Sequence, residues 1–120
     1  MNSIVKLKEN RDFRRAYSRG KSLVCPYVVL YYMKNRRGGI RLGITAGKKI
    51  GGAVSRNRAK RVITAAFRTC LPNISEGYDF VIVARTRILN VKSTVVASSL
   101  KKLLKDAGLF EKLKNEQITD

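Results

Sequence analysis

The chain has 120 residues, the length of a single domain, and 44% of them are hydrophobic, so its composition is that of a globular protein rather than of a disordered basic tail. Its 26 Lys and Arg side chains against 8 Asp and Glu give a formal net charge of +18, which predicts a polyanionic partner. The absence of histidine excludes a Ser–His or Cys–His nucleophile pair, and two cysteines without histidine fall short of a four-ligand zinc site.

In chain order, the hydrophobic periodicity changes between helical and strand patterns, with glycine or proline at most boundaries. It predicts a helix over 10–19, a strand over 22–33, a hairpin turn with a basic tip over 35–39, a strand over 40–46, a basic loop over 47–52, a long helix over 53–70, a strand over 78–84 and a last helix over 92–107. The first strand is open to a break at Pro26. This order predicts a single α+β sandwich with one small mixed sheet of about four strands and three helices.

The helix over 53–70 combines an apolar face with a basic one. On a helical wheel, the apolar residues fall within an arc of roughly 140°. They are Ala59, Val62, Ile63, Ala66, Phe67 and Cys70. Asn57, Arg61 and Arg68 cluster around the opposite pole, with Arg56, Lys60 and Arg58 at the flanks. We therefore expect one face to pack on the sheet and the other to present cations, next to the free N–H groups of the helix start and the preceding Lys48 and Lys49.

No acidic residue lies between Phe13 and Ser75, whereas fifteen Lys and Arg side chains do. A helix face that is merely solvated would carry acids at i±4 to relieve the repulsion between its cations. The pattern therefore favours binding to an anionic backbone. Two-metal hydrolysis of a phosphodiester needs several carboxylates near the phosphate, so we expect the isolated chain not to cleave RNA by that route.

Aromatic residues accompany the cations. Phe13 and Tyr17 share one helix face, and a period of two places Tyr27 and Tyr31 on one side of the first strand and Tyr32 on the other. Aromatic rings on an open sheet suit the stacking of unpaired bases, and the core of a small domain uses them as well. From the pattern alone, both interpretations stay open.

Other classes of protein fit the sequence less well. The stretch 43–48 resembles a phosphate-binding loop, but three residues rather than four separate its glycines, and Lys49 replaces the Ser or Thr that would bind Mg²⁺. The apolar runs are too short to span a bilayer, and no secretory signal begins the chain. Cys25 and Cys70 form no CxxC motif and are expected to be buried thiols in a reducing compartment. We expect a cytoplasmic protein.

The segment 47–61, GKKIGGAVSRNRAKR, resembles the signature of the bacterial ribonuclease P protein subunit, in which a Lys-Lys-x-Gly loop leads into an Arg-Asn-Arg helix. Further matches follow in the order of the family. They are Asp12-Phe13 with Tyr17 and Gly20, Val29-Leu30-Tyr31, Arg41-Leu42-Gly43, Phe67-Arg68 and the strand Asp79–Arg85. The resemblance covers roughly residues 6–110.

This resemblance implies an αβββαβα sandwich with an unusual left-handed crossover. The whole chain, 1–120, would be one RNA-binding domain with flexible ends at about 1–7 and 112–120. It would be the protein cofactor of ribonuclease P, a ribonucleoprotein endonuclease that hydrolyses one phosphodiester bond to remove the 5′ leader of precursor tRNA. Its partners would be the catalytic RNA, in a one-to-one complex, and the precursor tRNA. The catalytic Mg²⁺ ions would be bound by the RNA and none tightly by the protein.

The resemblance also assigns roles to two sets of residues. Phe13, Tyr17 and Tyr31 would line a cleft for the leader between the first helix and the sheet, while Tyr27 and Tyr32 stay undecided. The set that would face the catalytic RNA is Lys48, Lys49, Arg56, Asn57, Arg58, Lys60, Arg61 and Arg68.

The chain departs from the family at Thr64, where a Lys or Arg is usual, so this set lacks one basic contact. A ribosomal or other structural RNA-binding protein remains an alternative, because it would share the size, the charge and the basic helix. A cationic membrane-active protein is a second alternative, although the chain lacks a strongly amphipathic helix that is free of a folded core.

Overall fold

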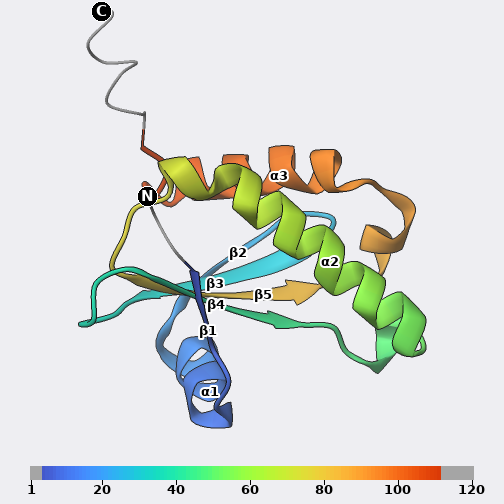
Figure 1. Ribbon diagram of the computed structural model, residues 1–120, viewed down its shortest axis with the longest axis horizontal. Helices are drawn as coiled ribbons and strands as arrows, with labels where there is room; N and C mark the ends of the chain where they lie inside the picture. The colour runs from blue at the N-terminus through green and yellow to red at the C-terminus, as the bar shows by residue number, and fades with distance from the viewer. Residues whose placement is uncertain (1–3, 112–120) are drawn as a thin grey trace, which may run out of the picture.

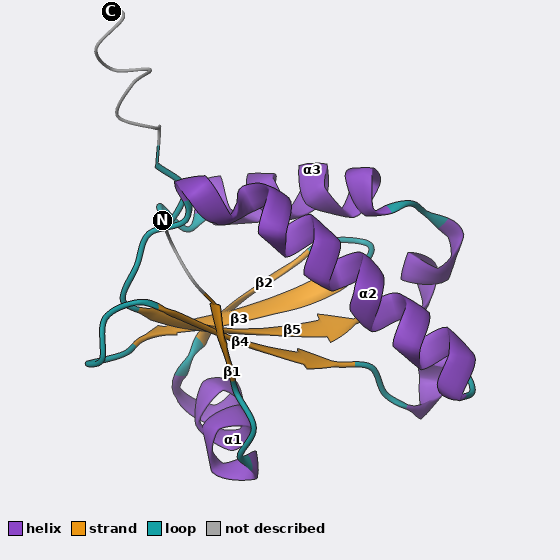
Figure 2. Ribbon diagram, in the orientation of Figure 1, coloured by secondary structure: helices purple, strands orange, loops and turns teal. Residues whose placement is uncertain are grey.

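The structure is a computed structural model that describes residues 4–111, and it consists of one mixed sheet with helices on both faces (Figure 1). In chain order its strands, helices and short 3₁₀ helices (η) are β1 (Ile4–Lys6), α1 (Asn10–Arg19), β2 (Lys21–Val24), β3 (Val28–Lys34), β4 (Ile40–Thr45), η1 (Lys48–Ile50), α2 (Ala53–Cys70), η2 (Leu71–Asn73), β5 (Tyr78–Ala84), η3 (Thr86–Asn90) and α3 (Ser93–Asp106). Helices α2 and α3 cover one face of the sheet, and α1 lies on the other (Figure 2). The α+β sandwich expected from the sequence is therefore confirmed.

The five strands follow the order β1-β4-β5-β3-β2, with β5 in the middle. Strand β5 is parallel to β4 and antiparallel to β3, and its run of buried residues is typical of a central strand. The predicted hairpin over 35–39 is therefore wrong, because β3 and β4 lie on opposite sides of β5 and do not pair. The hairpin is instead formed by β2 and β3, which are joined across the predicted break at Pro26.

Strand β1 is the fifth strand, one more than the sequence pattern predicted. Ile4 pairs in parallel with Ile40, and the backbone N–H of Leu7 donates to the carbonyl of Leu42 at 3.0 Å. Leu7 is buried, so this part of the expected flexible end instead belongs to the sheet. The other positions of the expected flexible ends, 1–3 and 112–120, lie outside the described residues.

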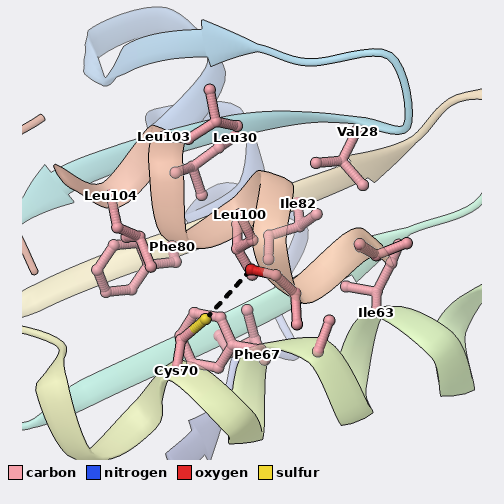
Figure 3. Packing of buried hydrophobic residues seen from close by; sticks show 14 of the residues in the cluster. Val28, Leu30, Ile63, Phe67, Cys70, Phe80, Ile82, Leu100, Leu103 and Leu104 are labelled. Atoms are coloured by element: carbon pink, nitrogen blue, oxygen red, sulfur yellow. Dashed lines mark hydrogen bonds between the residues drawn. The ribbon is translucent and has the colours of Figure 1, made fainter. Parts of the chain in front are cut away.

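The larger core lies between the sheet and the two helices α2 and α3 (Figure 3). The rings of Phe67 on α2 and Phe80 on β5 meet edge to face, with 5.5 Å between their centroids. The predicted apolar face of α2 is confirmed, since Ala59, Ile63, Ala66, Phe67 and Cys70 are buried. Burial also raises the pKa of the Cys70 thiol, which lies 3.8 Å from the carbonyl oxygen of Ala97 on α3. Cys25, by contrast, is only half-buried.

A smaller core holds α1 against the other face of the sheet. Leu7, Ala16 and Val81 are its buried members, and Phe13 and Tyr31 pack around them. The ring of Phe13 lies so close to Gly43 on β4 that a Cβ atom at this position would be 2.6 Å from the ring carbon Cε1. A glycine at this position of β4 therefore allows α1 to approach the sheet.

A buried ion pair joins β4 to β5 on this face, and α1 contacts it through Asp12. Asp79 on β5 is 5% exposed and accepts two hydrogen bonds from Arg41 on β4, the Nε–Oδ1 distance being 2.8 Å. Asn35 donates a further bond to Asp79 at 2.9 Å, and Asp12 of α1 lies 3.8 Å from Arg41. The hydrogen bond to Asp79 raises the pKa of Arg41, so this cation stays charged. Its charge serves an internal ion pair and not the binding of an external anion.

We predict that Gly43→Ala destabilises the protein by about 1–3 kcal/mol, because the added methyl group displaces the Phe13 ring. Denaturant unfolding would measure the loss. Gly47→Ala is the matched control, since a Cβ there meets no atom within 4 Å. Phe13→Leu should make the Gly43→Ala loss smaller in a double-mutant cycle. Equal stability of the Gly43→Ala and Gly47→Ala variants would contradict the proposed close contact.

Candidate nucleic-acid interface

The loop after β4 and the helix that follows it present the predicted basic surface. Lys48 and Lys49 are exposed on η1, and Gly51 then turns the chain with a φ of 133°, a value that favours glycine. On α2, Asn57, Lys60, Arg61 and Arg68 are exposed, while Arg56 and Arg58 are half-buried. None of these side chains forms an ion pair with another described residue. Their charge is therefore available to an external anion.

The start of α2 adds backbone donors to this surface. Its N-cap is Gly52, which provides no side-chain hydrogen bond, and the first turn contains no acidic residue. The first N–H groups of a helix have no partner within the helix, and the helix dipole makes this end attractive to anions. Lys48 and Lys49 lie on η1, a few residues before this end. This end of the helix is suited to a phosphate group.

The predicted basic residues do not all face the same way. Lys60, Thr64 and Arg68, spaced by four residues, line a cavity of about 250 Å³ at the edge formed by β1 and β4. Lys6 and the apolar side chains of Leu7, Phe13, Leu42 and others complete the lining, which contains no carboxylate. Arg58 lies towards η3, where its Nη1 is 3.5 Å from the carbonyl oxygen of Leu89.

The three aromatic residues predicted for a cleft lie on the α1 side of the sheet. The rings of Tyr17 and Tyr31 meet edge to face with 5.0 Å between centroids, and the Tyr17 hydroxyl lies 3.0 Å from Oγ1 of Thr45. Tyr17 is 41% exposed. Phe13 lies over Gly43 and lines the cavity beside Lys60 and Arg68, in which Tyr17 and Tyr31 take no part.

The structure also places the two undecided tyrosines. Tyr27 and Tyr32 both pack against the larger core under α2 and α3, on the other side of the sheet from Tyr31. The prediction that Tyr27 shares a side with Tyr31 is therefore wrong. Tyr27 precedes the first residue of β3, and the alternation of side chains holds only within a strand.

The sequence analysis did not identify Lys6 or Thr45 as parts of these surfaces. Lys6 reaches the cavity because β1 lies beside β4, and Thr45 reaches Tyr17 because α1 crosses the sheet. Strand alternation indicates that Thr45 and Gly43 share a face, but no local signal identifies their partners.

Over residues 4–111, no group of three or more His, Cys, Asp or Glu side chains could hold a metal ion. The buried carboxylate of Asp79 is bound by Arg41 and Asn35 instead. In the same part of the chain, no helix is long and apolar enough to cross a membrane.

Comparison with known proteins identifies the family of the chain. The ribonuclease P family model matches residues 1–108. The ribonuclease P protein component of Caldanaerobacter subterraneus is 41% identical, over 90% of this chain and 93% of its own, and that of Clostridium beijerinckii is 40% identical, over 98% and 97%. The chain belongs to the ribonuclease P protein family.

The solved structures of this family share the fold. The RNase P protein from Staphylococcus aureus superimposes with a TM-score of 0.78 at 34% identity, covering 88% of this chain and 97% of that one. The RNase P protein from Thermotoga maritima gives a TM-score of 0.75 at 34% identity, with 84% and 96% covered. Strands β4 and β5 are parallel neighbours joined through α2, so the β4–α2–β5 unit is a crossover connection.

Membership in the ribonuclease P family gives the chain the role of protein cofactor in tRNA 5′-end processing, within a ribonucleoprotein endoribonuclease. The RNA partner expected from the charge follows from the same membership. Membership in this family excludes the two alternatives, a ribosomal protein and a membrane-active protein.

We predict that Thr64→Arg strengthens binding to RNA. Thr64 lies between Lys60 and Arg68 along one side of α2, and its hydroxyl now bonds only the carbonyl of Lys60, at 2.8 Å. An arginine there would complete a row of three cations and should steepen the salt dependence of RNA binding by about one ion.

Thr69→Arg is the matched control. Thr69 makes the same kind of bond, to the carbonyl of Ala65, but lines a different cavity with residues of α3. If both variants changed RNA affinity and salt dependence equally, the row of Lys60, Thr64 and Arg68 would have no special part in binding.

Proposed function

We propose that the chain binds the catalytic RNA of ribonuclease P through η1 and the exposed face of α2, and the 5′ leader of precursor tRNA through the aromatic surface beside α1. The observation that supports this division is the distribution of ion pairs. The acidic residues Glu9, Asp12 and Asp79 pair with Arg11, Arg15 and Arg41, whereas the cations of η1 and α2 have no such partner among the described residues.

The basic surface is suited to the phosphates of a structured RNA. Its side chains stand on a helix that is fixed to the sheet by five buried residues, so their spacing is held by the fold. Lysine, arginine and free backbone N–H groups bind phosphate oxygens without reading the base sequence. This surface therefore provides affinity and orientation, and we infer that one chain binds one catalytic RNA.

The aromatic surface is suited to an unpaired strand. Tyr17 and Tyr31 offer ring faces and edges at the open side of the sheet, and Phe13 lies beside the cations Lys60 and Arg68. Stacking on such rings tolerates any base, while the neighbouring cations neutralise phosphates. A leader of variable sequence can be bound in this way.

We infer that the catalytic Mg²⁺ ions are bound by the RNA. Asp12 on α1 and Asp79 on β5 are both within ion-pair distance of Arg41, and Asp79 is buried, so neither is available as a metal ligand. The chain's own contribution is to offset the repulsion between two RNAs, which lowers the concentration of Mg²⁺ that they need. The relatives are bacterial, and we place this work in the cytoplasm, where bacterial tRNA is transcribed.

We predict that the purified chain, freed of RNA, does not cleave precursor tRNA. Added to a bacterial ribonuclease P RNA, it should allow cleavage at a Mg²⁺ concentration at which the RNA alone is inactive. A gel assay of leader release, with and without nuclease treatment of the protein sample, would test both statements. Cleavage by the nuclease-treated protein would show that the cofactor role is wrong.

We predict different losses from the two surfaces. Arg61→Ala should weaken binding to the catalytic RNA and flatten its salt dependence by about one ion, because an exposed phosphate contact is lost. Tyr17→Ala should weaken binding of precursor tRNA roughly fivefold or more relative to mature tRNA, because base stacking is lost.

Tyr17→Phe is the control for the second variant, since it keeps the ring and removes only the hydrogen bond to Thr45. Fluorescence titration with tRNA that has or lacks a leader would measure the effect. Equal losses for both RNAs with Tyr17→Ala would contradict the leader assignment.

A further inference from the structure

A second cationic and aromatic hollow lies at the other end of the molecule. It has a volume of about 330 Å³, and its lining includes Arg19, Lys21, Lys34, Tyr32, Tyr78 and Leu109. The strand register places Lys21 opposite Tyr32, and Lys34 opposite Tyr78, so both pairs lie side by side on the sheet. The hollow therefore has cations next to aromatic rings, as the aromatic surface beside α1 does.

This hollow is separate from both surfaces described above. Lys21, Tyr32 and Tyr78 are on the α2–α3 side of the sheet, whereas Tyr17 and Tyr31 meet on the α1 side. The hollow also lies at the end of the sheet where β3 ends and β5 begins. Strand β4 is parallel to β5, so Lys48 and Lys49, which follow the end of β4, lie at the end of the sheet where β5 ends. These two groups of cations are thus at opposite ends of the sheet.

The chemistry of the lining indicates its ligand. Arg19, Lys21 and Lys34 are exposed and form no ion pair with another described residue, and no carboxylate lines the hollow. The rings of Tyr32 and Tyr78 are tilted by 57°, with 6.5 Å between their centroids, and both side chains are only half-buried. Their hydroxyls have no hydrogen-bond partner among the described residues, so their capacity to donate and accept is unused within the fold.

We propose that this hollow binds one unpaired nucleotide of RNA, with the base against Tyr32 and Tyr78 and the adjoining phosphates on Lys21, Lys34 and Arg19. Its volume is at the lower end of the range for small-ligand sites, which suits a single nucleotide. Aromatic rings beside unpaired cations are the combination with which proteins hold unpaired strands. The proposal rests on the proposed function, since that function supplies an RNA partner.

The first experiment uses the hexanucleotide r(U)6 as the ligand and an RNA hairpin without unpaired ends as the control. In an NMR titration of the full chain, r(U)6 should shift the ring signals of Tyr32 and Tyr78 and the amide signals of Lys21 and Lys34. The hairpin should leave the two rings unchanged. If r(U)6 shifted Tyr17 and Tyr31 but not Tyr32 and Tyr78, the hollow would not be a nucleotide site.

The second experiment compares variants in RNA binding. Lys21→Gln/Lys34→Gln removes two exposed charges and should flatten the salt dependence of binding by about 1.4 in log–log slope, since each phosphate contact on a single strand contributes about 0.7. Tyr78→Leu keeps an apolar side chain, removes the ring and should weaken binding roughly fivefold. The control Lys101→Gln/Lys102→Gln removes the same charge from exposed positions of α3. Thermal unfolding would verify that each variant is folded.

The affinities of the variants for precursor tRNA, mature tRNA and ribonuclease P RNA identify which RNA supplies the nucleotide. A loss confined to precursor tRNA, relative to mature tRNA, assigns the hollow to the leader, and a loss with ribonuclease P RNA alone assigns it to the catalytic RNA. Variants that match the Lys101→Gln/Lys102→Gln control with all three RNAs would overturn the proposal. The proposed function fails separately, when the unaltered chain does not bind ribonuclease P RNA or when Arg61→Ala leaves that binding unchanged.

Discussion

The central position of β5 is the constraint on which the other features depend. Its consecutive buried residues point to both faces of the sheet, so each face needs helices packed against it. Helices α2 and α3 pack on one face and α1 on the other. Because β4 and β5 are parallel neighbours, the chain must return from the end of β4 to the opposite end of the sheet, where β5 begins. Helix α2 makes this return over one face of the sheet. The helix with the densest basic surface is therefore held along the sheet rather than on a loop. Its cations keep a fixed spacing that a flexible basic segment would lack.

Few acidic residues are placed where they would neutralise the basic surfaces. Asp79 lies within the sheet, where Arg41 and Asn35 bind it, and Asp12 joins the same group from α1. A buried pair of this kind contributes little net stability but is costly to break, so it fixes β4 relative to β5, and Asp12 adds a longer contact from α1. The same arrangement leaves the cations of η1 and α2 without an ion-pair partner among the described residues. These cations therefore repel one another, and binding of an anionic RNA backbone would reduce that repulsion.

Local patterns predicted the elements better than their pairing. The bounds of α2 and β5 follow from an apolar arc and an apolar run, both of which the sequence displays directly. The pairing of β3 with β5 joins residues far apart in the chain, so the basic turn at 35–39 was assigned to a hairpin that does not exist. The contact of Phe13 with Gly43 depends on the angle at which α1 crosses the sheet, and no spacing in the sequence encodes that angle.

The same limit explains how the candidate sites differ from their prediction. The basic and aromatic sets were expected as two surfaces, yet Phe13 lines one cavity with Lys60 and Arg68 because β1 and β4 form an edge that both helices reach. A strand bound there would have its bases near α1 and its phosphates near α2. Under the proposed function, binding of the leader and binding of the catalytic RNA would be coupled through the sheet edge, since both would use cations of α2. A cofactor of this kind would bring substrate and catalyst together by neutralising both backbones on one helix.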